Sequence, residues 1–599
     1  MHLGIFAANV GFILATAIML GGCGWVALAP FRDRLRYAPL VAPLAGLLCV
    51  VAGTLVLYTL LRLSLTTSGA IAAGTMLAAS AVALLVHWPD FSRRELVISL
   101  VALLVVSGFA VWWGMAAAIK AGGPAIIYWD GTDQLGYAHV ADWLKSHLVG
   151  TPPRTDPRVP YESWPALLFQ IDPRFGSFAL VALVSAVNGE SATFSYELAL
   201  TLVQVTAVLA FAGAFARSPL TLGLLVVGLF TCHWFDFGRT GFFGKTFGFP
   251  AMFLVVALLM VTLAETEIRV SRLIALMGLS IGAALAYSGI LTAFFIGVVG
   301  GGFLLTLGAR TRGEGLRPHL AAWMQKGSML LLLGATAIAA GSTLARPLSL
   351  GSPDYGVPWG YIFPRIAELE SQGVSMAGFD PGVLLAATWF MLGTWIFLGG
   401  LALVWWKKEA IAVLIAPLAL LGILCLVGAR AVTFQLIGFF YPFALAGLVV
   451  LLDTKRDEKP VAAGPGMTWV VLGLAVVVLG LHWFRFCGAT ARYGGAQTPP
   501  LALFTKTEVE AVASFVGRDK VEVDVVHPQM AMVLLVELGR RGIDLRWSAG
   551  AWKTLFAYRG WELPQYKEPG KWRIVLADTP DIPTDKVAFR SEHYWVLPR

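Results

Sequence analysis

The stretch Tyr128-Trp129-Asp130-Gly131-Thr132-Asp133-Gln134-Leu135-Gly136-Tyr137-Ala138 follows a long apolar segment and sets two carboxylates among aromatic and glycine residues. Charge in or near the hydrocarbon of a membrane costs free energy, so ionisable residues at such positions are rare and usually have a function. The stretch therefore predicts a polar site at the point where a helix leaves a membrane.

The composition is that of a polytopic membrane protein. Of the 599 residues, 57% are hydrophobic and only 13% are charged, whereas soluble proteins carry about 25% charged residues. Many apolar runs exceed the roughly 20 residues that a helix needs to cross a bilayer. The first run, about 5–28, has only His2 as a polar residue before it and is longer than the apolar part of a signal peptide, so we expect a retained spanning helix.

Charge and cysteine usage argue against several other classes. The net charge of +8 comes mostly from basic residues in short loops, a pattern that orients membrane proteins and gives no indication of nucleic-acid binding. The five cysteines form no CxxC pair and show no metal-ligand spacing. They therefore predict neither a disulfide framework nor a metal site.

Lysine and arginine in the loops orient the helices, because basic loops stay on the cytoplasmic side. The loops at 32–36 and 93–94 are basic, so the helices at about 39–61 and 70–87 lie between two inner loops. Helix four, about 96–118, then leads outward. The region 120–175, which contains the acidic stretch, is expected outside the membrane.

The apolar segment 175–187 decides the rest of the topology. Its 13 or so residues are too few for a span and suit a juxtamembrane helix lying at the surface. If it does not cross, every later basic loop faces inward, the N-terminus faces outward, and about 14 helices span the membrane. The inner loops then contain Arg217, Arg269 and Arg272, residues 310–326, Lys407-Lys408 and Lys455-Arg456, and the outer segments are 233–246, 346–381, 429–435 and the chain after about 486.

The C-terminal part differs in kind from the rest, because it is charged and lacks a spanning run. Residues 521–526 and 572–576 alternate like half-buried strands, and 507–515 and 530–540 have the pattern of amphipathic helices. We therefore predict an α-helical polytopic membrane protein with a small extracytoplasmic α/β domain. Its parts are additional N-terminal helices at 1–95, a transmembrane core at 96–486 with outer loops 119–194 and 346–381, and the α/β domain at 487–599.

Polar residues gather at the outer ends of helices and in outer loops, which favours an outer-face site over a pathway through the membrane. Carboxylates can act as general bases, and arginines can hold a phosphate with two hydrogen bonds. An enzyme on the outer face has no nucleotide sugar within reach, so its activated donor would arrive on a lipid. The four clusters are Asp130, Asp133, Tyr137, His139 and Asp142; His233, Asp236, Arg239 and Lys245; Arg346, Asp354, Tyr355, Trp359, Tyr361, Arg365, Glu368 and Asp380; and Arg430, Thr433 and Gln435.

Residues 133–144, DQLGYAHVADWL, resemble a first-outer-loop pattern, Asp-Glu-x-x-Tyr-Ala-x-x-Ala-x-x-Leu, of the GT-C superfamily of polytopic glycosyltransferases. That group includes aminoarabinose transferases, protein mannosyltransferases and oligosaccharyltransferases. Residues 172–191 are similar to the turn, juxtamembrane helix and polar loop that follow in the family, and 430–442 to its late outer loop. The chain departs from the family at Gln134, which replaces the second acidic residue, and in its three preceding helices.

The resemblance implies an inverting glycosyltransferase that moves a sugar from a polyprenyl-phosphate donor to a glycan, lipid or protein acceptor at the outer face of the membrane. The compact chain, without the loop insertions of eukaryotic proteins, favours a bacterial inner membrane. It implies Asp133 as general base, with Asp130 as the rival. The donor phosphate would be held by Arg430 together with Arg239, Lys245 or Arg365. Further substrate-binding candidates are Tyr137, His139, Arg174, His233, Asp236, Tyr355, Trp359 and Tyr361.

Simpler interpretations stay open. Asp130 could be a turn residue, Asp133 could only N-cap a helix over 134–145, and Arg430 could be an interfacial arginine. No histidine spacing supports a metal site, while a carboxylate-bound divalent cation near the two aspartates stays open as a cofactor. One alternative function is an O-antigen-type glycan polymerase or ligase. Another is a transporter or flippase, although the scarcity of charged residues in the middle of the spans argues against it.

Overall fold

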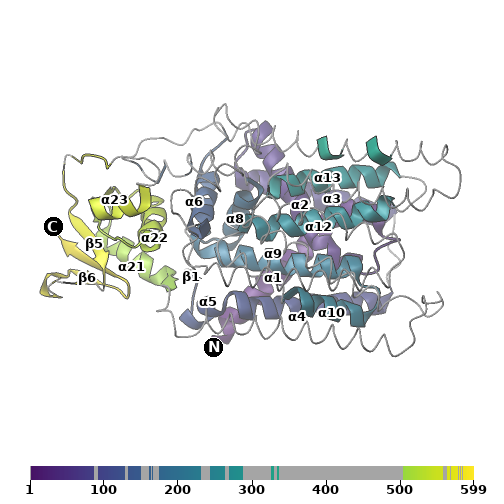
Figure 1. The fold of residues 1–599 in the computed structure, drawn as a ribbon, viewed down its shortest axis with the longest axis horizontal. Helices are drawn as coiled ribbons and strands as arrows, with labels where there is room; N and C mark the ends of the chain where they lie inside the picture. The colour runs from purple at the N-terminus through teal and green to yellow at the C-terminus, as the bar shows by residue number, and fades with distance from the viewer. Residues whose placement is uncertain are drawn as a thin grey trace, which may run out of the picture.

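The computed structural model describes residues 2–86, 92–127, 133–149, 175–230, 243–263, 269–287, 503–556 and most of 563–599, with short pieces at 159, 161–162, 165, 326–328 and 333–335. The described chain is mostly helical. Long apolar helices form a bundle, and a smaller region of strands and short helices lies at one end of it (Figure 1). Five described helices are long and apolar enough to cross a membrane, as in an integral membrane protein.

These five helices lie where the apolar runs predict spans. They are α1 (Leu3–Leu28), α2 (Ala38–Leu60), α3 (Leu65–Val86), α4 (Arg93–Gly114) and α9 (Ala192–Phe215). Helices α1 and α2 approach closely at Gly24 and Gly46, where an added Cβ would lie 2.0 Å from the Ala42 oxygen and 1.8 Å from the Leu20 oxygen. Small residues at such crossings are typical of helix packing in membranes.

Shorter helices complete the described bundle. The 3-10 helix η1 (Ala29–Phe31) follows α1, and α5 (Ala116–Ala121) follows α4. The others are α6 (Asp133–Ser146), α8 (Phe175–Asn188), α10 (Pro219–Phe230), α12 (Phe243–Leu263) and α13 (Val270–Ala286). The helices expected over 134–145 and 175–187 are therefore confirmed as α6 and α8.

The basic loops within the described chain meet at one end of the bundle. Arg36 Nε lies 3.0 Å from Glu95 Oε1, and the same guanidinium donates to the Arg217 carbonyl. Arg272 is fully buried and donates to the Pro30 oxygen at 2.7 Å and to both oxygens of Asp33 at 2.7 and 3.0 Å. The loops at 32–36, 93–95, 217 and 269–272 therefore share one end, as their predicted common side requires.

The acidic stretch lies next to the opposite end. Here β1 (Ala125–Ile127) pairs antiparallel with β2 (Leu503–Thr505), and His2 at the start of α1 lies beside Gly122. Helix α4 leads from the arginine end to β1, and α9 leads from α6 back to Arg217. Helix α8, which lies between them in the chain, therefore makes no net crossing.

The C-terminal region (503–599) contains a five-stranded sheet in the order β4-β3-β5-β7-β6. Its strands are β3 (Val521–Val523), β4 (Leu545–Trp547), β5 (Trp572–Leu576), β6 (Phe589–Arg590) and β7 (Tyr594–Pro598). β3 lies parallel to β4 and β5, with Val521 opposite both Leu545 and Trp572, while β7 runs antiparallel to β5 and β6. The helices are α21 (Lys506–Val516), α22 (Pro528–Gly539), α23 (Ala549–Phe556) and the 3-10 helix η3 (Thr584–Lys586).

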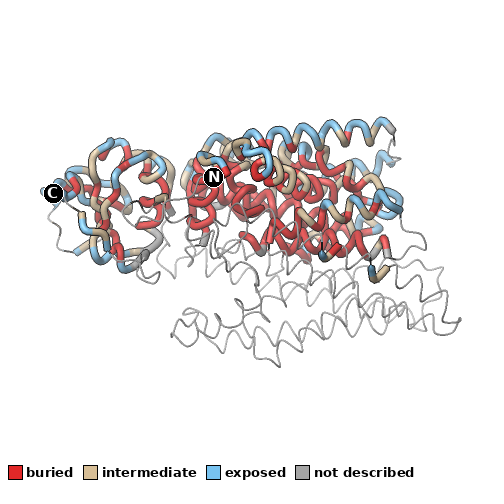
Figure 2. The backbone as a smooth tube through the Cα atoms, turned by 90° about the horizontal axis from the view of Figure 1, so that it is seen from above, coloured by how far each residue is buried: buried red, intermediate tan, exposed pale blue. Residues whose placement is uncertain are grey.

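Two hydrophobic cores hold these parts together. One fills the inside of the helix bundle and the other lies within the C-terminal region, as the buried segments in Figure 2 show. Large apolar side chains remain exposed along α3 and α4, among them Val82, Leu85, Leu100 and Leu104. A contiguous apolar outer face is expected where helices meet lipid.

The buried Arg272 predicts a stability effect at the arginine end of the bundle. Arg272→Ala should lower the free energy of unfolding by about 1–3 kcal/mol, because the Pro30 carbonyl loses its donor and Asp33 loses its bidentate partner. Arg34→Ala is the matched control, since its contact with Asp33 is 3.8 Å long and exposed, and should change stability by less than about 1 kcal/mol. Thermal unfolding in detergent measures both, and equal losses would contradict the assignment.

Candidate functional site

Helix α6 contains the C-terminal half of the acidic motif and lies across the end of the bundle, between the bundle and the C-terminal region (Figure 1). Tyr137 and Trp143 pack into the bundle core, while Leu135 joins Ile126 and Phe504 in the core of the C-terminal region. Apolar burial on two sides fixes the position of the helix. Helix α6 is therefore packed against both hydrophobic cores.

Asp133 is the first residue of α6. The N-terminus of a helix carries partial positive charge, which favours a carboxylate there. The stretch 128–132, with Asp130, joins the end of β1 at Ile127 to this helix start. The structure does not describe the side chain of Asp133 or residue Asp130, so the choice between capping and catalysis stays a prediction.

Tyr137 links the first predicted cluster to the second. Its hydroxyl accepts a hydrogen bond from the backbone N–H of Gly244 at 3.1 Å, and its ring lies 5.1 Å from Phe178 and 5.6 Å from Phe243 between ring centroids. The first N–H groups of a helix have no partner within the helix, so Tyr137 caps α12. Lys245, a predicted phosphate ligand, is the next residue of that helix; its side chain is not described.

His139 is fully buried. Nε2 lies 2.6 Å from the Tyr161 carbonyl oxygen, and the two rings stack with centroids 4.6 Å apart. Burial lowers the pKa of His139 to about 3, which keeps the imidazole neutral. The Tyr161 ring in turn covers Gly539 of α22, where an added Cβ would lie 2.8 Å from it. His139 and Tyr161 therefore fasten α6 to the C-terminal region.

Asp142 supports the start of helix α9. Its Oδ1 accepts from the Ala192 N–H in the first turn of α9 at 3.1 Å and lies 3.4 Å from Lys145 Nζ. Lys145 also donates to Ser185 of α8 at 2.6 Å. Burial raises the pKa of the Asp142 carboxyl, and the charge of Lys145 partly offsets that rise. Asp142 and Lys145 together therefore join α6, α8 and α9 at the end of the bundle opposite the arginine loops.

Within the described chain, one group of three side chains has metal-ligand proximity, namely Glu508, Glu592 and His593. Glu508 Oε1 accepts from the Ser591 hydroxyl and the His593 N–H, both at 2.7 Å, and Oε2 lies 2.8 Å from His593 Nδ1. The carboxylate is thus engaged by protein donors on both oxygens. These bonds fasten the turn between β6 and β7 to α21 and do not indicate a bound ion.

The remaining predicted site residues fall outside the described chain. Of the second polar cluster, only the backbone of Lys245 is described, and the third and fourth clusters lie wholly outside the described residues. The residues concerned are Arg174, His233, Asp236, Arg239, Tyr355, Trp359, Tyr361, Arg365 and Arg430.

Several polar residues of this end were not singled out from the sequence. Tyr161 carries the stacking contact with His139, Glu190 pairs with Lys506 Nζ at 2.7 Å, and Glu197 is buried in α9. A lone carboxylate in an apolar span is a recognisable signal, and it identifies Glu197. No local pattern identifies Tyr161 or the Glu190–Lys506 pair, because their partners are distant in the chain.

Comparison with known proteins found no match to a family model and none to a curated protein.

The cap on α12 can be tested by removing one oxygen atom. Tyr137→Phe leaves the buried Gly244 N–H without its acceptor, which should cost about 1–3 kcal/mol and speed hydrogen exchange in peptides covering 243–250. Tyr58→Phe removes a hydroxyl that donates to the His147 carbonyl at 3.0 Å and should leave exchange in 243–250 unchanged. Hydrogen-exchange mass spectrometry compares the two variants, and identical exchange in wild type and Tyr137→Phe would refute the cap.

The Glu508–His593 contact predicts a pH dependence of stability. Burial alone would lower the pKa of His593, but the hydrogen bond and the charge of Glu508 outweigh it and raise that pKa above its ordinary 6.5. The stabilisation from His593 is therefore full below about pH 6.5 and is lost as pH rises through the raised value. His593 and Ser591 lower the pKa of Glu508 below 4.5, so its stabilisation is full above about pH 4.5 and is lost on further acidification. The two contributions overlap between these values.

Thermal unfolding of the full chain across pH 4–8 measures this dependence. The difference between wild type and Glu508→Gln should be largest between about pH 4.5 and 6.5 and smaller on either side. Asp585→Asn, an exposed change in η3 outside this contact, serves as control and should follow the wild-type profile. If the difference in unfolding temperature between wild type and Glu508→Gln does not change with pH, protonation of Glu508 and His593 is not coupled to folding.

Proposed function

We propose that the protein is a GT-C-type membrane glycosyltransferase, which transfers a sugar from a polyprenyl-phosphate donor to an acceptor at the outer face of the membrane. The observation that supports this most is the fixed position of α6. The helix begins at Asp133, and its Tyr137 binds the start of α12 next to Lys245. A general-base candidate and a cation candidate for the donor phosphate therefore belong to helix ends that are joined directly.

In the proposed mechanism Asp133, or its rival Asp130, takes the proton from an acceptor hydroxyl or amine. The acceptor atom then bonds to the anomeric carbon on the face opposite the phosphate. The bond from that carbon to the phosphate oxygen breaks, and the lipid phosphate leaves with the electron pair. A single displacement of this kind inverts the anomeric centre. Arg430 with Arg239, Lys245 or Arg365 would balance the charge on the leaving phosphate.

The proposed orientation places β1, α6 and the C-terminal region outside a bacterial inner membrane. The shared arginine end of the bundle supports it, since basic loops stay on the cytoplasmic side. About 14 spanning helices, an extracytoplasmic α/β domain at the C-terminus and a closing role for loop 346–381 belong to the same proposal.

Purified Asp133→Asn and Asp130→Asn variants test the mechanism directly. Loss of the general base should lower the rate of sugar transfer from a polyprenyl-phosphate donor by about 10²–10⁴-fold. Asp585→Asn, an exposed change in η3, is the matched control and should keep wild-type activity.

Three results would contradict the proposal. Full activity in both aspartate variants would rule out a carboxylate base at this place. Transfer of whole glycan chains would indicate a polymerase or ligase. Uptake of substrate by proteoliposomes, with no covalent product, would indicate a transporter.

A further inference from the structure

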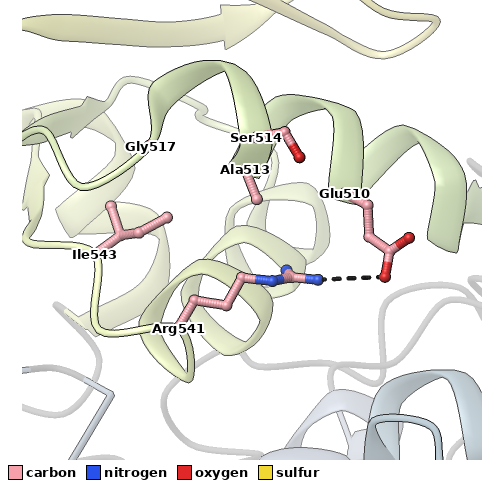
Figure 3. Close-up of a pocket in the computed structure, with 6 residues that line it drawn as sticks. All are labelled: Glu510, Ala513, Ser514, Gly517, Arg541 and Ile543. Atoms are coloured by element: carbon pink, nitrogen blue, oxygen red, sulfur yellow. Dashed lines mark ion pairs between the residues drawn. The ribbon is translucent and has the colours of Figure 1, made fainter.

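A surface cavity of about 310 Å³, wide open to solvent, lies on the C-terminal region between α21 and the end of α22. Figure 3 shows Glu510 and Ser514 on α21 and Arg541 just beyond α22 around this space. Ala513, Gly517 and Ile543 complete the lining. The volume lies at the small end of the usual range for ligand sites, about 300–1,000 Å³, which suits one sugar unit better than an extended chain.

The guanidinium of Arg541 lines the cavity and is held in place by Glu537. Its Nη1 donates to the Glu537 carbonyl at 2.9 Å and lies 3.5 Å from Glu537 Oε2. Its Nη2 lies 3.8 Å from Glu510 Oε1, beyond hydrogen-bonding distance. Figure 3 marks this ion pair with a dashed line. Because the Glu510 side chain is 47% exposed, a ligand hydroxyl can enter between the two groups and bond to both.

The lining is balanced in charge, which selects against ions. An anionic ligand at Arg541 would meet the carboxylates of Glu510 and Glu537, and a cationic ligand at Glu510 would meet Arg541. Neutral hydroxyl groups both donate and accept, so they can satisfy Arg541, Glu510 and the Ser514 hydroxyl together. Ser514 also lies in the last turn of α21, where helix carbonyls lack donors from the helix. A polyhydroxylated neutral ligand therefore fits best.

A series of ion pairs and one hydrogen bond connects this cavity to α6. Glu510 lies 3.8 Å from Lys506, and Lys506 lies 2.7 Å from Glu190. Lys145 of α6 lies 3.4 Å from the Glu190 carbonyl oxygen and pairs with Asp142. The cavity is thus joined by a continuous row of contacts to the helix that begins at Asp133.

We propose that the cavity between α21 and α22 binds a neutral monosaccharide unit. Binding itself depends only on the lining residues. The further assignment of this unit to the acceptor glycan rests on the proposed glycosyltransferase function.

Saturation-transfer NMR on the full chain tests binding without any transfer reaction, in a detergent that has no sugar headgroup. The probes are glucose, galactose, mannose and N-acetylglucosamine, with inorganic phosphate as the anionic comparison. At least one neutral sugar should bind and phosphate should not. Ser514→Leu, which fills the cavity, should weaken sugar binding by about tenfold or more. Thr507→Leu is the control, an exposed change on the same helix outside the lining.

Glu510→Gln provides a second, independent test, because it keeps a hydrogen-bonding side chain while removing the negative charge. Phosphate binding should appear in this variant, as Arg541 then faces the cavity with one carboxylate fewer. The proposal is overturned if wild type binds phosphate and no neutral sugar, or if Ser514→Leu and Thr507→Leu bind sugar equally well.

The acceptor assignment has its own readout. Where sugar transfer is demonstrated, Ser514→Leu should raise the KM for the acceptor and leave kcat unchanged. If the sugar binds but no transfer occurs with any donor, the binding site stands and the proposed function fails.

Discussion

Helix α6 is buried on one side by the bundle core and on the other by the core of the C-terminal region, and the geometry of this end of the bundle follows from that packing. The helix holds the start of α12 through Tyr137 and the start of α9 through Asp142. Burial of several large side chains supplies the free energy, and the polar bonds set direction and register. A loop carrying the same residues would lack this support.

The sequence was sufficient to predict most of the described bundle, for a physical reason. A run of about 20 apolar residues has few alternatives to a spanning helix, which is why α1 to α4 and α9 match their expected positions. The apolar segment that forms α8 is too short to span a bilayer, so its length distinguished it from these helices. Strand β3 was predictable because its alternation matches one buried face. Strand β5 lies where the sequence predicted it, but it buries the adjacent residues Ile574 and Val575 and so shows no such alternation.

The missed features depend on partners that are remote in the chain. The three residues of β1 are too few to show alternation, and β2 forms its other half. Asp142 belonged to the acidic cluster, but its bond to the Ala192 N–H depends on how α6 crosses α9. For the site itself, the sequence indicates which residue types gather outside, and the described structure locates Asp133, Tyr137 and His139 on one helix. The roles of Asp133 and Asp130 stay a prediction.

The β1–β2 pair has a consequence for the order of assembly during synthesis. Strand β1 and α6 leave the ribosome long before β2, and until then Ile126 and Leu135 have no second core to enter. Helices already inserted in the membrane shorten the effective loop, and loop-closure entropy grows slowly with length in any case. The end of the bundle at α6 should therefore mature in one late step, when the C-terminal region docks. A chain arrested before residue 503 would expose this apolar surface to chaperones and proteases.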